Sequence, residues 1–257
     1  MNNYSIHSQF FAIVLLLICG CSGETTDVTP IQIESASNTS STDFNILFIG
    51  NSHSRVNNLP NLVKILIETG MQDKNVDAQV APYSGFLAEH LAIGSTKDLV
   101  ESRAWTHVIL QAQKYSSSGL YSYPTTAAEN WIRIAKARNA TPLLFPEWPR
   151  RGNFEEGQRV YDLHLYIASQ EPACVAPIGL VWDQVITTHP SIVLHAPDGN
   201  HSSLAGALLT SYVFYQIITG NLASSLPYTN QVDVSSFVQK QLRDIASSVT
   251  SQYTCPD

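Results

Sequence analysis

Four short segments of the sequence carry side chains that could together perform acyl transfer. Gly50-Asn51-Ser52 supplies a hydroxyl, and Asp198-Gly199-Asn200-His201 supplies a carboxylate and an imidazole. Gly85 and the pair Gln111 and Gln113 add backbone and side-chain N–H donors for a developing oxyanion. Acyl transfer needs a hydroxyl, an imidazole that removes its proton, a carboxylate that orients the imidazole, and such donors. The sequence contains all of these groups.

Each of these residues also has a common structural use. Ser52 could simply cap a helix, as serine often does. Asp198-Gly199 is a good turn dipeptide, and His201 could be a polar residue at a helix start. Their joint occurrence, with Gly85 in between, favours a catalytic set, because the roles complement one another.

The segment before Ser52 predicts how this hydroxyl is presented. Phe44–Ile49 is apolar at five of six positions, a pattern typical of a strand buried on both faces of a parallel sheet. Apolar residues then recur at helical spacing over residues 57–70, and Gly70 supplies a stop. Strand, turn and helix together place Ser52 at the carboxyl edge of the sheet, where open α/β sheets bind ligands.

Strands and helices are expected to alternate along the rest of the chain. This alternation predicts an α/β fold, a doubly wound parallel sheet with helices on both faces. The further strands are expected near residues 77–83, 107–110, 142–145 and 175–178, and the further helices near residues 86–91, 127–135, 154–169, 204–218 and 234–249.

Three blocks of the sequence resemble those of the SGNH-type (GDSL-like) hydrolases, serine esterases on a flavodoxin-like fold. Ile49–Ser54 resembles the nucleophile block, Tyr83–Gly85 the glycine block, and Asp198–Gly206 the final block with its following helix. The resemblance covers Phe44 to about Gly220. It implies a three-layer α/β/α architecture with a five-stranded parallel sheet.

The same resemblance implies a role for each site residue. Ser52 would be the nucleophile, His201 the general base and Asp198 the orienting carboxylate. The oxyanion would be bound by the backbone N–H groups of Ser52 and Gly85 and by a side-chain amide of the third block.

That third block departs from the family pattern. The usual Gly-x-Asn reads Gln111-Ala112-Gln113 here, and a glutamine offers the same amide donor on a longer stem. Direct register puts Gln113 at the asparagine position, and which of Gln111 and Gln113 lines the oxyanion hole stays open. The usual Asp after the first Gly is Asn51.

Two residues after the fourth expected strand are candidates for substrate binding. Trp148 and Arg150 lie on the presumptive active edge and could stack on and bind a sugar. Trp148 could equally be a core residue.

Composition excludes some classes of function. The 257 residues are 44% hydrophobic and 14% charged, which suits one folded domain. The net charge is −7 and no basic patch is visible, so nucleic-acid binding has no support. No Cys-x-x-Cys or other zinc-like spacing occurs, so a structural metal is not expected. No cofactor is expected either.

The N-terminus predicts export. Phe10–Ile18 is apolar and too short to span a bilayer, but suits the core of a secretory signal. The following Cys19-Gly20-Cys21 resembles the bacterial lipoprotein box, which implies residues 1–20 as signal peptide and Cys21 as the lipidated residue. A plain signal peptide is the alternative. The polar residues 21–42 would be a flexible tether, and residues 43–257 the folded domain.

Two cysteines then remain in the mature chain. Cys174 and Cys255 could pair in an oxidising compartment, although sequence alone does not show that they meet.

The function expected from these observations is a membrane-anchored bacterial esterase in the periplasm or on the cell surface. It would remove an acyl group, with acetyl expected, from a carbohydrate or a similar polar substrate. A catalytically weak or inactive glycan-binding lipoprotein is the main alternative. A flavodoxin-like nucleotide binder is less favoured, because the sequence lacks a Gly-rich phosphate loop. Oligomeric state is left open.

Overall fold

A computed structural model describes residues 42–255, so the signal peptide, Cys21 and all but the last residue of the predicted tether lie outside the described residues. The described chain contains one sheet of five parallel strands in the order β2-β1-β3-β4-β5. This confirms the predicted α/β fold with a five-stranded parallel sheet. The strands are β1 (Phe44–Ile49), β2 (Val76–Val80), β3 (His107–Gln111), β4 (Thr141–Phe145) and β5 (Cys174–Val175).

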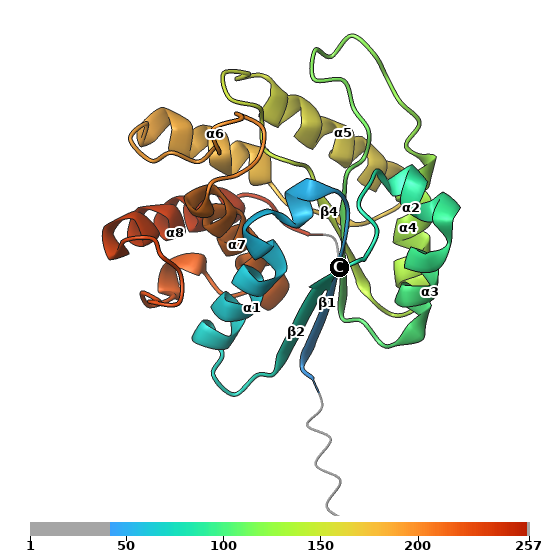
Figure 1. Ribbon diagram of the computed structural model, residues 1–257, viewed down its shortest axis with the longest axis horizontal. Helices are drawn as coiled ribbons and strands as arrows, with labels where there is room; N and C mark the ends of the chain where they lie inside the picture. The colour runs from blue at the N-terminus through green and yellow to red at the C-terminus, as the bar shows by residue number, and fades with distance from the viewer. Residues whose placement is uncertain (1–41, 256–257) are drawn as a thin grey trace, which may run out of the picture. The chain divides into compact units, whose positions relative to one another are not determined.

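Helices cover both faces of the sheet, as Figure 1 shows, with α1, α6, α7 and α8 on one side of the strands and α2, α3 and α4 on the other. Helix α5 packs with the second group through Tyr161 and Ile167. The helices are α1 (Leu59–Gly70), α2 (Leu87–Ile93), α3 (Ser95–Ser102), α4 (Thr126–Ala137), α5 (Glu156–Gln170), α6 (Ile178–Thr188), α7 (Leu204–Thr219) and α8 (Ser236–Thr250).

Strand β1 is buried on both faces. Ile46 and Phe48 point into the core that α1, α6, α7 and α8 share, whereas Leu47 and Ile49 point into the core under α2–α5. The direction alternates because successive side chains of a strand point to opposite faces of the sheet. All four side chains are fully buried, because helices cover both faces. The continuous apolar run is thus explained by two separate cores, and it fixes the turn that carries Ser52.

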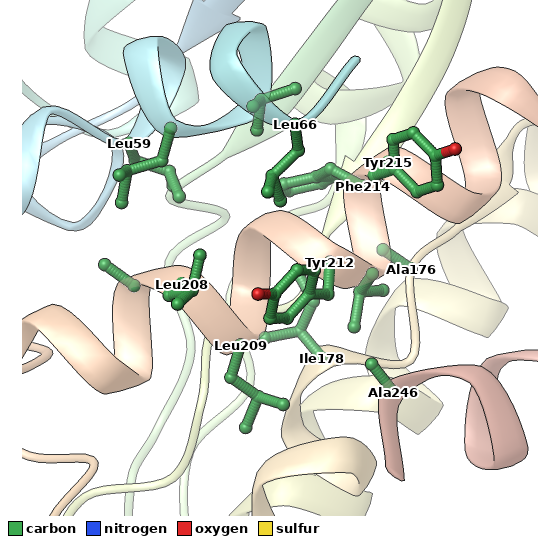
Figure 2. Packing of buried hydrophobic residues seen from close by; sticks show 14 of the residues in the cluster. Leu59, Leu66, Ala176, Ile178, Leu208, Leu209, Tyr212, Phe214, Tyr215 and Ala246 are labelled. Carbon is green, nitrogen blue, oxygen red and sulfur yellow. The ribbon is translucent and has the colours of Figure 1, made fainter. Parts of the chain in front are cut away.

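Helix α7 is the centre of the first core. It is apolar nearly all round and packs against α1, α6 and α8, with Tyr212, Phe214 and Tyr215 among its buried side chains (Figure 2). Its N-terminus lies three residues after His201, and the Ser203 side chain caps it by accepting from Gly206 N–H at 3.2 Å. The anchored helix therefore fixes the end of the segment that carries His201.

Two helices were not predicted. Residues 175–178 were expected to form a strand, but β5 ends at Val175, and α6 begins at Ile178 directly after Pro177. The buried positions 178, 181, 182 and 185 have helical spacing, which could have identified α6. Helix α3 has only Thr96 and Val100 buried, which is too few apolar positions for a periodic signal.

Cys174 and Cys255 form a disulfide, with their Cα atoms 4.6 Å apart. The bond ties the chain end to edge strand β5. Across residues 42–255, no helix is both long and apolar enough to cross a bilayer.

We expect the Cys255→Ser variant to lose about 2–4 kcal/mol of unfolding free energy, because the bond closes a long loop in the unfolded chain. Urea unfolding measures the loss. Wild-type protein unfolded in the presence of a reductant is the matched control and should coincide with the variant. Equal stability of oxidised wild type and variant would contradict the expectation.

Candidate active site

Three predicted residues meet at the carboxyl edge of the sheet. Nε2 of His201 lies 2.8 Å from Oγ of Ser52, and Nδ1 of His201 lies 2.6 Å from Oδ2 of Asp198. Ser52 is exposed on the turn after β1, and Asp198 and His201 lie on the loop before α7. Both separations are within hydrogen-bond range, so the hydroxyl, imidazole and carboxylate form one continuous chain.

The Asp198 carboxylate fixes the state of the imidazole. Its Oδ2 contacts His201 Nδ1, and its Oδ1 accepts from the backbone N–H groups of Asn200 and His201, both at 2.9 Å. These hydrogen bonds hold the pKa of Asp198 well below its usual range, and the one with the His201 ring has the largest effect. An ionised carboxylate only accepts hydrogen bonds, so Nδ1 carries the proton and Nε2 is free to accept from Ser52.

The turn that presents Ser52 is held from below by Gln111, which is completely buried. Gln111 Oε1 accepts from the Asn51 N–H at 2.8 Å and from the Ser54 hydroxyl at 3.1 Å. A Cβ at Gly50 would lie 2.3 Å from that same oxygen, so the glycine is required for this approach. The other end of the amide donates to Glu147 at 2.7 Å. Gln111 therefore supports the turn that carries Ser52 and does not line the cleft.

Gln113 is the glutamine that lines the cleft with Ser52, as direct register suggested. Its amide nitrogen, however, donates to the backbone carbonyls of Lys114 at 2.9 Å and Pro124 at 3.1 Å. The sequence predicted that this amide is available to an oxyanion. In the structure both of its hydrogen bonds go to the loop between β3 and α4 instead.

Two backbone N–H groups remain for an oxyanion. Within residues 42–255, the Ser52 N–H has no hydrogen-bond acceptor. The Gly85 N–H donates to the Gly50 carbonyl at 3.4 Å, longer than an ordinary N–H···O bond. Both groups were predicted from the sequence as oxyanion donors.

The loop that carries Asp198 is bound to the segment that follows β4. The Arg151 N–H donates to the Gly199 carbonyl at 2.9 Å, and its guanidinium donates to the carbonyls of His195 at 3.3 Å and Ala196 at 2.5 Å. The Trp148 indole N–H donates to the Asn200 carbonyl at 2.8 Å. The loop is thus held through its backbone carbonyls, and this leaves its side chains free for chemistry.

The prediction that Trp148 contacts the substrate is wrong, and its alternative, a place in the core, is what the structure shows. Its side chain is 1% exposed and its ring stacks on Trp182 with a centroid distance of 4.7 Å. A ring covered in this way has no face for a sugar, so Trp148 belongs to the core. Burying this large aromatic ring stabilises the fold, because it removes a large apolar surface from water.

Arg150, the other predicted substrate contact, is exposed and lines the cleft. Its backbone N–H donates to the buried Glu156 at 2.6 Å, whereas its guanidinium has no hydrogen-bond or ion-pair partner in the described part of the chain. The cleft has a volume of about 220 Å³ and polar walls. They are formed by Asn51, Ser52, His53, Phe86, Ala112, Gln113, Tyr115, Ser117, Glu147, Arg150 and Asn200.

His53 and Glu147 are site residues that the sequence did not single out. The His53 ring is buried and stacks on the His201 ring with a centroid distance of 5.1 Å. Its Nδ1 lies 3.1 Å from Asn51 Oδ1 and 3.9 Å from a Glu147 oxygen. The position of His53 directly after Ser52 was the only available signal. No group of three or more potential metal ligands occurs among residues 42–255.

No protein-family model matches the sequence, and no curated protein matches it either. Solved structures do. A candidate SGNH hydrolase from Slackia heliotrinireducens is 24% identical with a TM-score of 0.54, over 68% of this chain and 98% of that one. A DUF4886 family protein from Bacteroides uniformis is 14% identical with a TM-score of 0.64. The match covers 80% of this chain and 94% of that one.

A psychrotrophic esterase from Pseudoalteromonas, solved with the inhibitor monoethylphosphonate, is also similar. It is 18% identical with a TM-score of 0.51, over 69% of this chain and 98% of that one. At these identities the likeness shows the fold. The chain therefore has the fold of the SGNH hydrolases, as the resemblance of its sequence blocks predicted.

The two glutamines should differ in their effect on stability. Gln111→Leu removes the partner of the half-buried Asn51 N–H, of the buried Ser54 hydroxyl and of the Glu147 carboxylate, so we expect a loss of about 1–3 kcal/mol. Gln113→Leu is the matched control and should cost less, because the carbonyls it leaves belong to the exposed residues Lys114 and Pro124, where water can reach them. Urea unfolding of both variants measures the difference, and equal losses would contradict it.

Proposed function

We propose that the chain is a serine esterase in which Ser52, His201 and Asp198 act as nucleophile, general base and orienting carboxylate. The observation that carries the proposal is the continuous contact from Ser52 through His201 to Asp198, at 2.8 and 2.6 Å. The fold shared with SGNH hydrolases supports the same reaction class, although a fold alone does not establish an activity.

The reaction then follows from the arrangement of these groups. Ser52 Oγ attacks the ester carbonyl carbon while its proton passes to His201 Nε2. The tetrahedral intermediate collapses to an acyl-enzyme, and the alcohol leaves with the proton from Nε2. Water then attacks the acyl-enzyme with His201 as base again, which releases the acid and restores Ser52. The ionised Asp198 stabilises the imidazolium that forms in each half-reaction.

The Ser52 and Gly85 N–H groups are the proposed oxyanion donors. Donors of this kind stabilise charge that develops only in the transition state. Gln113 could join them only by giving up a carbonyl partner, so we assign its amide to holding the loop between Lys114 and Pro124.

The cleft favours a substrate with a small acyl group and a polar surround. Its volume of about 220 Å³ leaves room for a short acyl chain such as acetyl beside Ser52, and its walls carry hydroxyl, amide, carboxylate and guanidinium groups. The exposed Arg150 guanidinium can donate to hydroxyl or carboxylate oxygens of the alcohol. An acylated carbohydrate would present such groups.

A phosphonate ester probe tests the nucleophile directly. We expect covalent labelling of Ser52, located by mass spectrometry of the digested protein, and hydrolysis of p-nitrophenyl acetate. Ser52→Ala should abolish labelling and lower kcat by about 10⁶-fold. Ser54→Ala is the control, because this buried hydroxyl contacts Gln111 and should not be needed for labelling. A wild-type protein that neither reacts with the probe nor turns over esters would favour the glycan-binding alternative.

We also propose export with lipid attachment at Cys21. The Cys174–Cys255 disulfide supports an oxidising compartment, where such bonds persist. Expression in a bacterium fed a radiolabelled or alkynyl fatty acid should label the wild-type chain and leave Cys21→Ser unlabelled. Labelling of both chains, or of neither, would contradict the assignment.

A further inference from the structure

A second and larger hollow borders the catalytic cleft. This groove has a volume of about 540 Å³, more than twice that of the cleft. It lies among the segment after β4, helix α6 and the segment that leads to Asp198. Its walls are mainly apolar and include Pro149, Phe154, Ile186, Pro190, Ile192 and Leu194.

The groove and the cleft share Arg150, which lines both. The groove is also next to the loop that carries His201, because Leu194 and His195 form part of its wall and Arg151, another wall residue, binds the carbonyl of Gly199. In the proposed reaction His201 gives its proton to the departing alcohol. The groove, which borders the loop of His201 and shares Arg150 with the cleft, is therefore placed to receive a part of the alcohol that extends beyond the cleft.

The surface of the groove favours an apolar ligand. Two large apolar side chains that line it stay in contact with water, with Phe154 74% exposed and Val193 64% exposed. The carboxyl of Asp183 is also on the wall, where burial and then the charge of Glu156 raise its pKa to about 6. Covering this surface with an apolar group would remove the exposed carbon from water, which is favourable.

We propose that the groove binds an apolar part of the alcohol that the ester releases, while the acyl group occupies the smaller polar cleft at Ser52. This inference rests on the proposed esterase function and adds the class of alcohol. The substrate would be an amphipathic ester, polar near the bond that is cut and apolar farther along the alcohol.

Acetate esters of primary alcohols test the proposal in the wild-type protein. Each buried methylene group is worth about fourfold in affinity, so burying three of the six extra methylenes of octyl acetate should raise kcat/KM about 60-fold over ethyl acetate. Ethyl octanoate carries the same chain on the acyl side and should be no better than ethyl acetate, because the cleft is too small and polar for it.

Variants of the exposed groove residues give the second measurement. Val193→Asp and Phe154→Ala should lower kcat/KM for octyl acetate several-fold and leave that for ethyl acetate unchanged. Phe237→Ala is the matched control, since Phe237 is 70% exposed on α8 and does not line the groove. It should change neither value.

Three outcomes would overturn the inference: equal kcat/KM for ethyl and octyl acetate, a groove variant that leaves octyl acetate unaffected, or a preference for ethyl octanoate that Val193→Asp abolishes, which would put the acyl chain in the groove. Failure of the proposed function would look different. Ethyl acetate would then not be hydrolysed by wild type any faster than by Ser52→Ala.

Discussion

The contact between Ser52 Oγ and His201 Nε2 joins two segments that are 149 residues apart in the sequence. The rest of the described structure keeps these segments in place. Strand β1 holds the first, because its side chains are buried in two different cores and allow no change of register. Helix α7 holds the second, because it is buried nearly all round and starts just after His201. The two segments are also bonded directly, because the Asn57 amide donates to the Ser202 carbonyl at 2.9 Å.

Polar groups near the site are divided between support and chemistry. A nucleophile turn needs an exposed hydroxyl, yet its backbone N–H groups must not stay unpaired in the interior. Gln111 meets both needs, because its side-chain oxygen accepts from the Asn51 N–H and the Ser54 hydroxyl. The Ser52 hydroxyl is not used in these bonds. The cost is a buried amide that needs a partner of its own, and Glu147 supplies it. Gln111 is therefore completely buried, whereas Ser52 and Asp198, which are proposed to react, are exposed.

The fold and the edge position of Ser52 could be predicted from the sequence, because burial and edge position follow from local pattern, and the grouping of Ser52 with Asp198 and His201 followed from the resemblance of the sequence blocks. A strand buried on both faces is continuous in its apolar residues, and parallel strands bring their carboxyl ends to one edge. The partners of individual polar groups could not be predicted. The Gln113 amide meets the Pro124 carbonyl only because the loop between them folds back, and Trp148 is covered by Trp182 of α6, a neighbour that helical spacing alone does not give. Such contacts depend on tertiary geometry that no spacing encodes.

Arg150 and Arg151 show how far neighbouring identical residues diverge in one site. The Arg151 guanidinium is bound to the carbonyls of His195 and Ala196, so its influence on Ser52 chemistry passes through the loop that carries Asp198. The Arg150 guanidinium has no partner in the described chain and lies where the cleft and the groove meet. In the proposed esterase, replacing Arg151 would disturb the loop that carries Asp198, and hence the turnover of every ester. Replacing Arg150 would act only on substrates that reach its guanidinium.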